Sequence, residues 1–277
     1  LGEYRQDFKN SFLFIDAGYT PGYKKKSNTK TDGSRLHFFS KFNMSLIEED
    51  DKNSNLEINL QKASNDTYFK IYDLETSLVD KEKKDLENSI NYTYQKEDFY
   101  FSLSPSKYED MTKIGHLRDE YLLPLTVEKN IMSNEKFGFL DLNTNLKIRN
   151  YDTNKRTDFL INDFNWKSNK WLNKFGFENS VLGQVKTVNY QAKKTKKFKN
   201  NGTNSEIKSV LGYFTKLGMY KNDVNNKNIY TLTPKFLLRY APGHMRNIDS
   251  GKLNYSNLYN INKFNDLDVL ENGLSTS

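Results

Sequence analysis

The sequence predicts an all-β protein, a partial antiparallel up-and-down transmembrane β-barrel. Apolar and polar residues alternate with a period of two in one segment after another, and clusters of turn-forming residues separate these segments. Aromatic residues reach 14% of the chain although the hydrophobic fraction is only 36%. A strand with one apolar and one wet face alternates in this way, and the wet faces of a barrel dilute its mean hydropathy.

The clearest predicted strand covers residues 140–151. It alternates one series, Leu140, Leu142, Thr144, Leu146 and Ile148, with a second series, Asp141, Asn143, Asn145, Lys147 and Arg149. The same alternation occurs at 56–61 and 90–94. Further strands are predicted at Phe12–Tyr19, Leu36–Leu46, Thr67–Leu74, Phe99–Ser104, Leu123–Val127, Thr157–Trp166, Gly176–Tyr190, Ile207–Tyr220 and Ile229–Tyr240. Several of these segments exceed the usual length of a globular strand.

Polar turn clusters separate the predicted strands and favour hairpins between neighbours. They lie at Lys24–Gly33, Glu48–Ser54, Asp80–Asp85, Tyr151–Arg156, Lys199–Ser205 and Lys221–Lys227. No segment has sustained helical periodicity, and Val79–Glu87, the best candidate, is predicted to be a loop. The strand pattern continues from end to end without a linker. We therefore expect residues 1–277 to form a single β-barrel domain segment of a longer precursor, cut at both ends.

Composition narrows the class of protein. No run approaches the ~18 apolar residues of a membrane helix, and a mean hydropathy of −0.84 excludes a helical membrane protein. A formal net charge of +7 favours acidic partners such as an anionic membrane surface, a phosphate-rich lipid or nucleic acid. The abundance of Lys, Asn and Ile is typical of codon bias in an AT-rich genome. The number of Lys residues is therefore weak evidence for a basic binding site. The absence of Cys excludes disulfides, thiolate zinc sites and cysteine nucleophiles.

No pattern in the sequence indicates an enzyme, a cofactor or a metal site. His37, His116 and His244 are widely spaced, and neither a nucleophile elbow nor a phosphate-binding loop is present. The acidic cluster at 48–51 is predicted to be a solvated hairpin turn. The Lys-rich run at 193–199 resembles a nucleic-acid patch but favours the tip of a long hairpin, with acidic lipid headgroups as its functional contact.

Two prolines interrupt strand-like runs. Pro124 follows Tyr121-Leu-Leu, and Pro234 precedes Lys-Phe-Leu-Leu-Arg-Tyr240. Because proline cannot donate a hydrogen bond to a sheet, each proline is predicted to mark a strand start or a bulge.

The C-terminal part of the chain resembles the LptD family of lipopolysaccharide-assembly proteins. The resemblance rests on the run Leu232-Thr-Pro-Lys-Phe-Leu-Leu-Arg-Tyr-Ala-Pro-Gly243 and on the segment 258–273. The matching positions are Pro234, Tyr240, Pro242, Asn262, Phe264, Asp268, Glu271 and Gly273. The chain departs from the family pattern at Lys263, Asp266 and Val269. Weaker similarity extends to earlier pieces, including Tyr121-Leu-Leu-Pro124.

The resemblance implies a large barrel in the outer membrane of a Gram-negative bacterium, with this chain supplying early and middle strands. Such a barrel takes lipopolysaccharide from a periplasmic bridge protein and releases it into the outer leaflet through a lateral gate. An outer-membrane lipoprotein plug is a further possible partner, and outer-membrane lipid surrounds the wall. Cations expected along the substrate path are Lys147, Arg149, Lys235 and Arg239.

Two alternatives stay open. Another outer-membrane barrel, such as a porin or a receptor, shares the alternation and the aromatic content but lacks the Pro-containing strand and the 262–273 segment. A soluble β-sandwich that binds a polyanion through basic loops is the third class. It predicts solubility without detergent, whereas a barrel predicts aggregation unless detergent or lipid is supplied.

Overall fold

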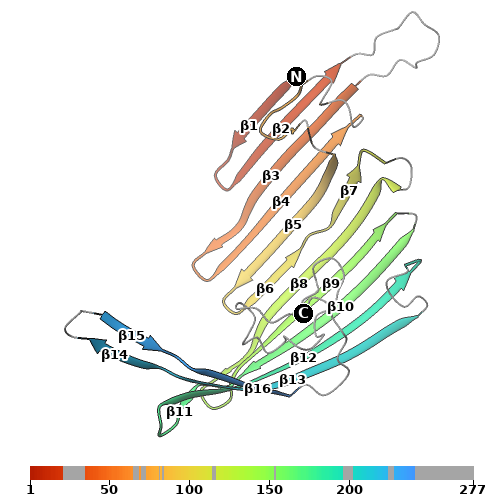
Figure 1. Cartoon of the computed structure of the whole chain (residues 1–277). Helices are drawn as coiled ribbons and strands as arrows, with labels where there is room; N and C mark the ends of the chain where they lie inside the picture. The colour runs from red at the N-terminus through yellow and green to blue at the C-terminus, as the bar shows by residue number, and fades with distance from the viewer. Residues whose placement is uncertain are drawn as a thin grey trace, which may run out of the picture. The chain divides into compact units, whose positions relative to one another are not determined.

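The computed structural model describes residues 1–20, 35–64, 69, 73–80, 82, 84–113, 117–152, 154–195, 202–223 and 228–240. All sixteen elements of these residues are strands, and every strand pair with a defined register is antiparallel (Figure 1). The predicted all-β, up-and-down fold is therefore confirmed. None of the described residues belongs to a helix with the length and apolarity needed to cross a bilayer.

The strands are long and follow one another along the sheet. Their bounds are β1 Gly2–Asp7, β2 Ser11–Thr20, β3 Arg35–Glu49, β4 Lys52–Ala63, β5 Asp85–Lys96, β6 Phe99–Leu103, β7 Ser106–Asp110, β8 Asp119–Asn134, β9 Gly138–Tyr151, β10 Lys155–Lys167, β11 Trp171–Leu172, β12 Phe177–Lys193, β13 Thr203–Leu217, β14 Met219–Asp223, β15 Asn228–Leu232 and β16 Lys235–Tyr240. The order is β1-β2-β3-β4-β5-β6-β8-β9-β10-β12-β13-β16. The short strand β7 pairs with β5 and β8, β11 pairs with β12, and β14 and β15 form a separate hairpin.

Contacts divide the chain into two units. Unit 1 holds residues 1–127, 145–159 and 190–204, and unit 2 holds residues 128–144, 160–189 and 205–277. The boundaries fall within strands β8, β9, β10 and β12 and near the start of β13. The predicted single domain over 1–277 stays a prediction, and each unit is described here by itself.

In unit 1 the register gives the sheet two different faces. Leu56 pairs with Tyr92 and Ile58 with Ile90, whereas Glu57, between them, pairs with Asn91. Paired residues share a face and successive residues alternate. We call one side the apolar face; it holds Leu13, Ile15, Ala17, Tyr19, Leu36, Phe38, Phe42, Met44, Leu56, Ile58, Leu60, Ile90, Tyr92, Tyr94, Phe99, Phe101 and Leu103. The other, the polar face, holds Glu3, Arg5, Asp16, Lys41, Asn43, Asn55, Glu57, Asn59, Gln61, Ser89, Asn91, Thr93, Gln95 and Ser102.

The buried apolar cluster of unit 1 begins on the polar face. Phe39 and Ala63 of β3 and β4 meet Phe69, Leu74 and Val79 from the connection between β4 and β5. Meanwhile the apolar face keeps large side chains exposed, with Tyr19 at 64% and Ile90 at 47%. The sheet thus covers part of its polar side and leaves its apolar side open.

One predicted strand is wrong. The described residues of Thr67–Leu74, which are Phe69, Asp73 and Leu74, do not belong to any strand. Asp73 has a positive φ of 47°, and the Leu74 N–H donates to the Phe69 carbonyl at 2.9 Å, so the chain turns here. Phe69 and Leu74 pack in the buried cluster with Phe39 and Ala63 instead. The predicted loop at Val79–Glu87 ends earlier than expected, because β5 begins at Asp85.

Unit 2 has the same two-sided character. A hydrogen-bond chain runs from Thr144 to Asn162 at 2.9 Å and from Asn162 to Thr187 at 3.1 Å, so these residues share one face. Residues two positions away lie on that face too, among them the exposed Phe164 and Val185. The opposite face carries the buried polar residues Gln184 and Lys186 and the half-buried Asp163.

Pro234 marks a strand start, whereas Pro124 lies inside a strand. Pro234 directly precedes β16, and its carbonyl accepts from the Leu217 N–H at 3.1 Å, so the predicted strand start is confirmed. Pro124 lies inside β8, just after the residues that pair with β7, and its carbonyl accepts from Ser104 at 3.1 Å. The predicted strand 207–220 is interrupted by Gly218, which separates β13 from β14.

Candidate functional site

Among the described carboxylates of unit 1, Asp16 is the most deeply buried. Its side chain is only 2% exposed, as is that of His37 on the neighbouring strand. The His37 imidazole donates through Nε2 to Oδ1 of Asp16 at 2.9 Å, and the Thr76 hydroxyl donates to Oδ2 at 2.6 Å. A buried carboxyl group is tolerated when both of its oxygens accept hydrogen bonds.

Gly18 makes room for this arrangement. Gly18 pairs with His37 across β2 and β3, and a Cβ at Gly18 would lie 2.5 Å from Cε1 of His37. No real Cβ tolerates such a contact, so the imidazole lies against the strand only because residue 18 lacks a side chain. The glycine therefore positions His37 for its bond to Asp16.

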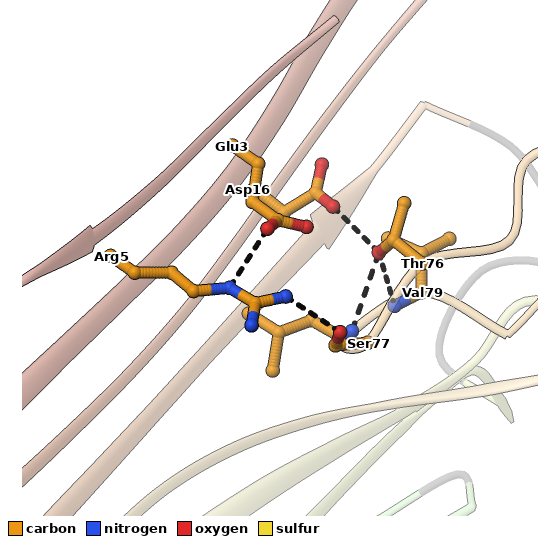
Figure 2. Close-up of polar contacts among 7 residues, drawn as sticks. Glu3, Arg5, Asp16, Thr76, Ser77 and Val79 are labelled. Atoms are coloured by element: carbon orange, nitrogen blue, oxygen red, sulfur yellow. Dashed lines mark hydrogen bonds and ion pairs between the residues drawn. The ribbon is translucent and has the colours of Figure 1, made fainter.

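Residues 73–80, which we call the crossing segment, are fixed to the polar face by two neighbouring contacts (Figure 2). Besides donating to Asp16, the Thr76 hydroxyl accepts from the backbone N–H of Val79 at 3.1 Å, and Thr76 N donates back to the Val79 carbonyl. Arg5 donates to the Ser77 hydroxyl at 2.8 Å and pairs with Glu3 at 2.8 Å. The crossing segment is thus bonded to both β1 and β2.

A second polar centre lies where β5, β7, β8 and β9 approach one another. Arg149 binds Glu120 with two hydrogen bonds, from Nε at 2.6 Å and from a terminal nitrogen at 3.1 Å, and its guanidinium lies 4.1 Å from the centre of the Tyr151 ring. A hydrogen bond from Lys113 to Asp110 raises the pKa of the Lys113 amine above its ordinary value. A cavity of ≈ 500 Å³ here is lined mainly by acidic side chains, namely Asp85, Glu87, Asp110, Asp119, Glu120 and Asp152.

The acidic side chains of this cavity do not converge on one point in the described residues. Within the part of the chain that the structure describes, no three carboxylate or histidine side chains converge as the ligands of a metal ion would. Its acidic lining is balanced in part by Lys113 and Arg118. The cavity therefore presents a mixed, wet surface rather than a closed coordination site.

In unit 2 the corresponding buried polar group is Lys186. Its Nζ lies 3.3 Å from Oδ1 of Asp163, and the Lys186 side chain is only about one-twentieth exposed. Gln184, two residues earlier on the same face, lies at the outer limit of hydrogen bonding to the same oxygen, at 3.5 Å. A buried ammonium needs a carboxylate partner of this kind to offset its lost hydration.

The sequence-predicted cations fall into two groups. Lys147 and Arg149 lie in unit 1, where the Arg149 guanidinium donates two hydrogen bonds to Glu120 and lies over the Tyr151 ring. Lys235 is exposed at the start of β16, where its backbone pairs with Lys216 in unit 2, and the backbone of Arg239 pairs with Gly212. One pair of these residues thus belongs to unit 1 and the other pair to unit 2.

The family-motif residues are only partly described. Pro124, Pro234 and Tyr240 lie in or beside strands of the sheet, and Tyr240 is exposed at the end of β16. Pro242, Asn262, Phe264, Asp268 and Gly273 lie outside the described residues, and so do His116 and His244.

Sequence reasoning missed the Asp16 centre. The available signal was a carboxylate in the polar phase of an otherwise apolar strand, Ser-Phe-Leu-Phe-Ile-Asp-Ala-Gly-Tyr. Its partners His37 and Thr76 lie 21 and 60 residues further along the chain. Only the strand register and the path of the crossing segment bring them to Asp16.

Comparison with known proteins adds no family assignment. No protein-family model matches the sequence, and no curated protein matches it either. The two-faced sheet is therefore the feature of the molecule that bears most directly on its function.

Proposed function

We propose that the chain is part of the wall of a β-barrel in a bacterial outer membrane, and that the barrel moves lipopolysaccharide to the outer leaflet. One observation carries the first half of this proposal: the apolar face is open while charged and amide side chains lie on the opposite face. Soluble monomers rarely expose an apolar patch that runs across several strands. The apolar face therefore fits contact with the hydrocarbon core of a membrane.

Strand length supports the same surrounding. A barrel strand needs about 9–11 residues to cross the hydrocarbon core when it is tilted. β2, β4 and β5 contain 10, 12 and 12 residues, and β12 contains 17. In hydrocarbon every backbone group must be paired. Among the described strands β1 pairs with β2 and β16 with β13, so a closed wall needs a further partner at each of these two edges.

The cargo is inferred from the resemblance to the LptD family together with the chemistry of the polar face. Lipopolysaccharide carries acidic sugars and phosphates, and cations along a path bind these groups by charge-assisted hydrogen bonds. Cations that already have acidic neighbours, such as Arg149 beside Glu120, hold a passing phosphate weakly enough to release it. A periplasmic bridge protein delivers the cargo and supplies the driving force. An outer-membrane lipoprotein that plugs the barrel is a further proposed partner.

The test is depletion of the full-length protein in its host, followed by measurement of newly made lipopolysaccharide at the cell surface. We expect surface arrival to fall as the protein is depleted. Unchanged arrival together with reduced uptake of small solutes would refute the cargo and favour a porin instead.

A matched pair of charge reversals tests the role of the polar face. Lys147→Glu changes the polar face, whereas Lys62→Glu makes the same change on β4 at a position paired with Phe38 of the apolar face. With equal amounts of folded protein, we expect Lys147→Glu to slow surface arrival and Lys62→Glu to leave it unchanged. Equal effects of the two variants would contradict a cargo path along the polar face.

A further inference from the structure

A groove lies on the apolar face of unit 1, where the sheet is interrupted between β6 and β7. Ser104 and Pro105 separate these two short strands, and the Pro105 carbonyl accepts from the Ile90 N–H at 3.0 Å. β8 contacts both strands, because Ser106 pairs with Leu122 and Ser104 donates to the Pro124 carbonyl. The interruption leaves a hollow of ≈ 440 Å³ in the surface.

The walls of the groove are apolar along most of its length. They are formed by Leu60 of β4, Ile90 of β5, Leu123 of β8 and Ile148 of β9, with Pro105 in the interruption. Leu60 and Ile90 remain 44% and 47% exposed, so the groove is open toward the surroundings of the apolar face. Its volume lies in the range of about 300–1,000 Å³ that small-molecule sites occupy.

One end of the groove is lined by Lys107 and Tyr121, and two carboxylates lie beside the Lys107 ammonium. Lys107 pairs with Tyr121 and Glu109 with Asp119, so these four residues share one face of β7 and β8. The Lys107 ammonium lies 3.1 Å from Asp119, 3.6 Å from Glu109 and 5.7 Å from the centre of the Tyr121 ring. The amide residues Asn88 and Asn150 complete this end of the lining.

Apolar walls ending in a paired cation and carboxylate match an amphiphile whose headgroup has both charges. A purely anionic headgroup would meet Lys107 but would be repelled by Asp119 and Glu109. A zwitterionic headgroup places its phosphate at Lys107 and its ammonium at Asp119. An unfilled hollow would lose dispersion contacts along its walls, which favours an occupant with a flexible hydrocarbon chain.

We propose that the groove binds one zwitterionic glycerophospholipid, with an acyl chain between Ile90, Leu123 and Ile148 and the headgroup at Lys107 and Asp119. The proposal rests on the proposed function only in assuming that the apolar face meets lipid. It assigns to this face a specific lipid site in addition to general contact with the bilayer.

The test uses the full-length protein in bilayers that contain spin-labelled phosphatidylethanolamine. We expect a slowly exchanging lipid in addition to the ordinary shell of lipids around the protein. Ile90→Trp fills the groove and should abolish the slow component. Leu36→Trp is the matched control on the same face, because Leu36 is similarly exposed, at 38%, and does not line the groove.

The headgroup requirement is tested with Lys107→Gln and with a second lipid. We expect Lys107→Gln to weaken retention of phosphatidylethanolamine about tenfold, the typical effect of losing a hydrogen bond to a charged group. Phosphatidylglycerol should not give the slow component in the wild type. Equal retention of the two lipids would overturn the proposed headgroup pairing.

A slow component that persists in Ile90→Trp would overturn the site itself. If Ile90→Trp does not fold, the same measurement is made with Ile148→Trp, which fills the groove from β9. A normal lipid shell without a slow component would refute the groove and leave the membrane wall standing. The absence of any lipid shell would refute the membrane wall, so the two failures are distinguishable.

Discussion

Replacing Thr76 by Val should loosen the crossing segment. The change keeps the size of the side chain but removes the hydroxyl that donates to Asp16 at 2.6 Å and accepts from Val79 N at 3.1 Å. A hydrogen bond to a charged group contributes about 1.5–3 kcal/mol. Because Asp16 is 2% exposed, water does not easily replace the lost donor. We therefore expect the free energy of local opening to fall by about 2–3 kcal/mol.

Hydrogen exchange of the backbone amides in residues 73–80 measures this opening in the full-length protein held in detergent micelles. Since 1.4 kcal/mol corresponds to a factor of ten, exchange at Val79 should become roughly 30- to 150-fold faster. Ser77→Ala is the matched control, because it removes only the bond from Arg5, whose side chain is 52% exposed. An exposed contact contributes about 0.5–1 kcal/mol, so the control should accelerate exchange only about two- to fivefold.

The comparison between the two variants tests whether the hydrogen bond from Thr76 to Asp16 holds the crossing segment. Equal acceleration in Thr76→Val and Ser77→Ala would refute the reasoning, because it would mean that the buried Asp16 bond holds the segment no better than an exposed contact. Acceleration restricted to β2, with the crossing segment unchanged, would also contradict it.

Three further outcomes are expected. Gly18→Ala should displace His37 from Asp16, seen as a shifted imidazole NMR signal, whereas an unshifted signal would contradict the close approach at Gly18. Gly138→Ala should lower the free energy of unfolding by about 1–3 kcal/mol, measured by denaturant unfolding. Gly138 has a φ of +83°, and an added Cβ would overlap the Lys167 carbonyl. Spin labels placed singly along 140–148 should report oily and aqueous surroundings by turns, and uniform wetness there would contradict the membrane wall.

Period-two alternation predicted most strands because each strand has two unlike surroundings. Leu140–Tyr151 lies within β9 and Leu36–Leu46 within β3. In β3, Leu36, Phe38, Phe42 and Met44 share the apolar face as expected, whereas Phe39 lies on the polar face. The same pattern failed at Thr67–Leu74, where apolar residues contact the sheet from outside it. An alternating pattern indicates which side chains have apolar surroundings. It does not indicate whether the backbone of the segment pairs with another strand.

The polar centres were harder to predict than the strands. Arg149 was singled out as a path cation, yet its pairing with Glu120 depends on which residues of β8 and β9 lie near each other. Lysine in an alternating strand ordinarily faces water, so the sequence does not predict that Lys186 is buried beside Asp163. Contacts between distant segments decide these roles, and composition and spacing do not encode them.

The bond between Arg5 and Ser77 has a consequence for the rim of the sheet. Among the described strands β1 pairs with β2 alone, over six residues, so backbone hydrogen bonds hold it on one side only. Ser77, however, belongs to a stretch of chain anchored separately through Thr76 to β2. Separating β1 from β2 therefore also requires breaking the hydrogen bond between Arg5 and Ser77. This side-chain contact holds β1 to the sheet in addition to its backbone hydrogen bonds.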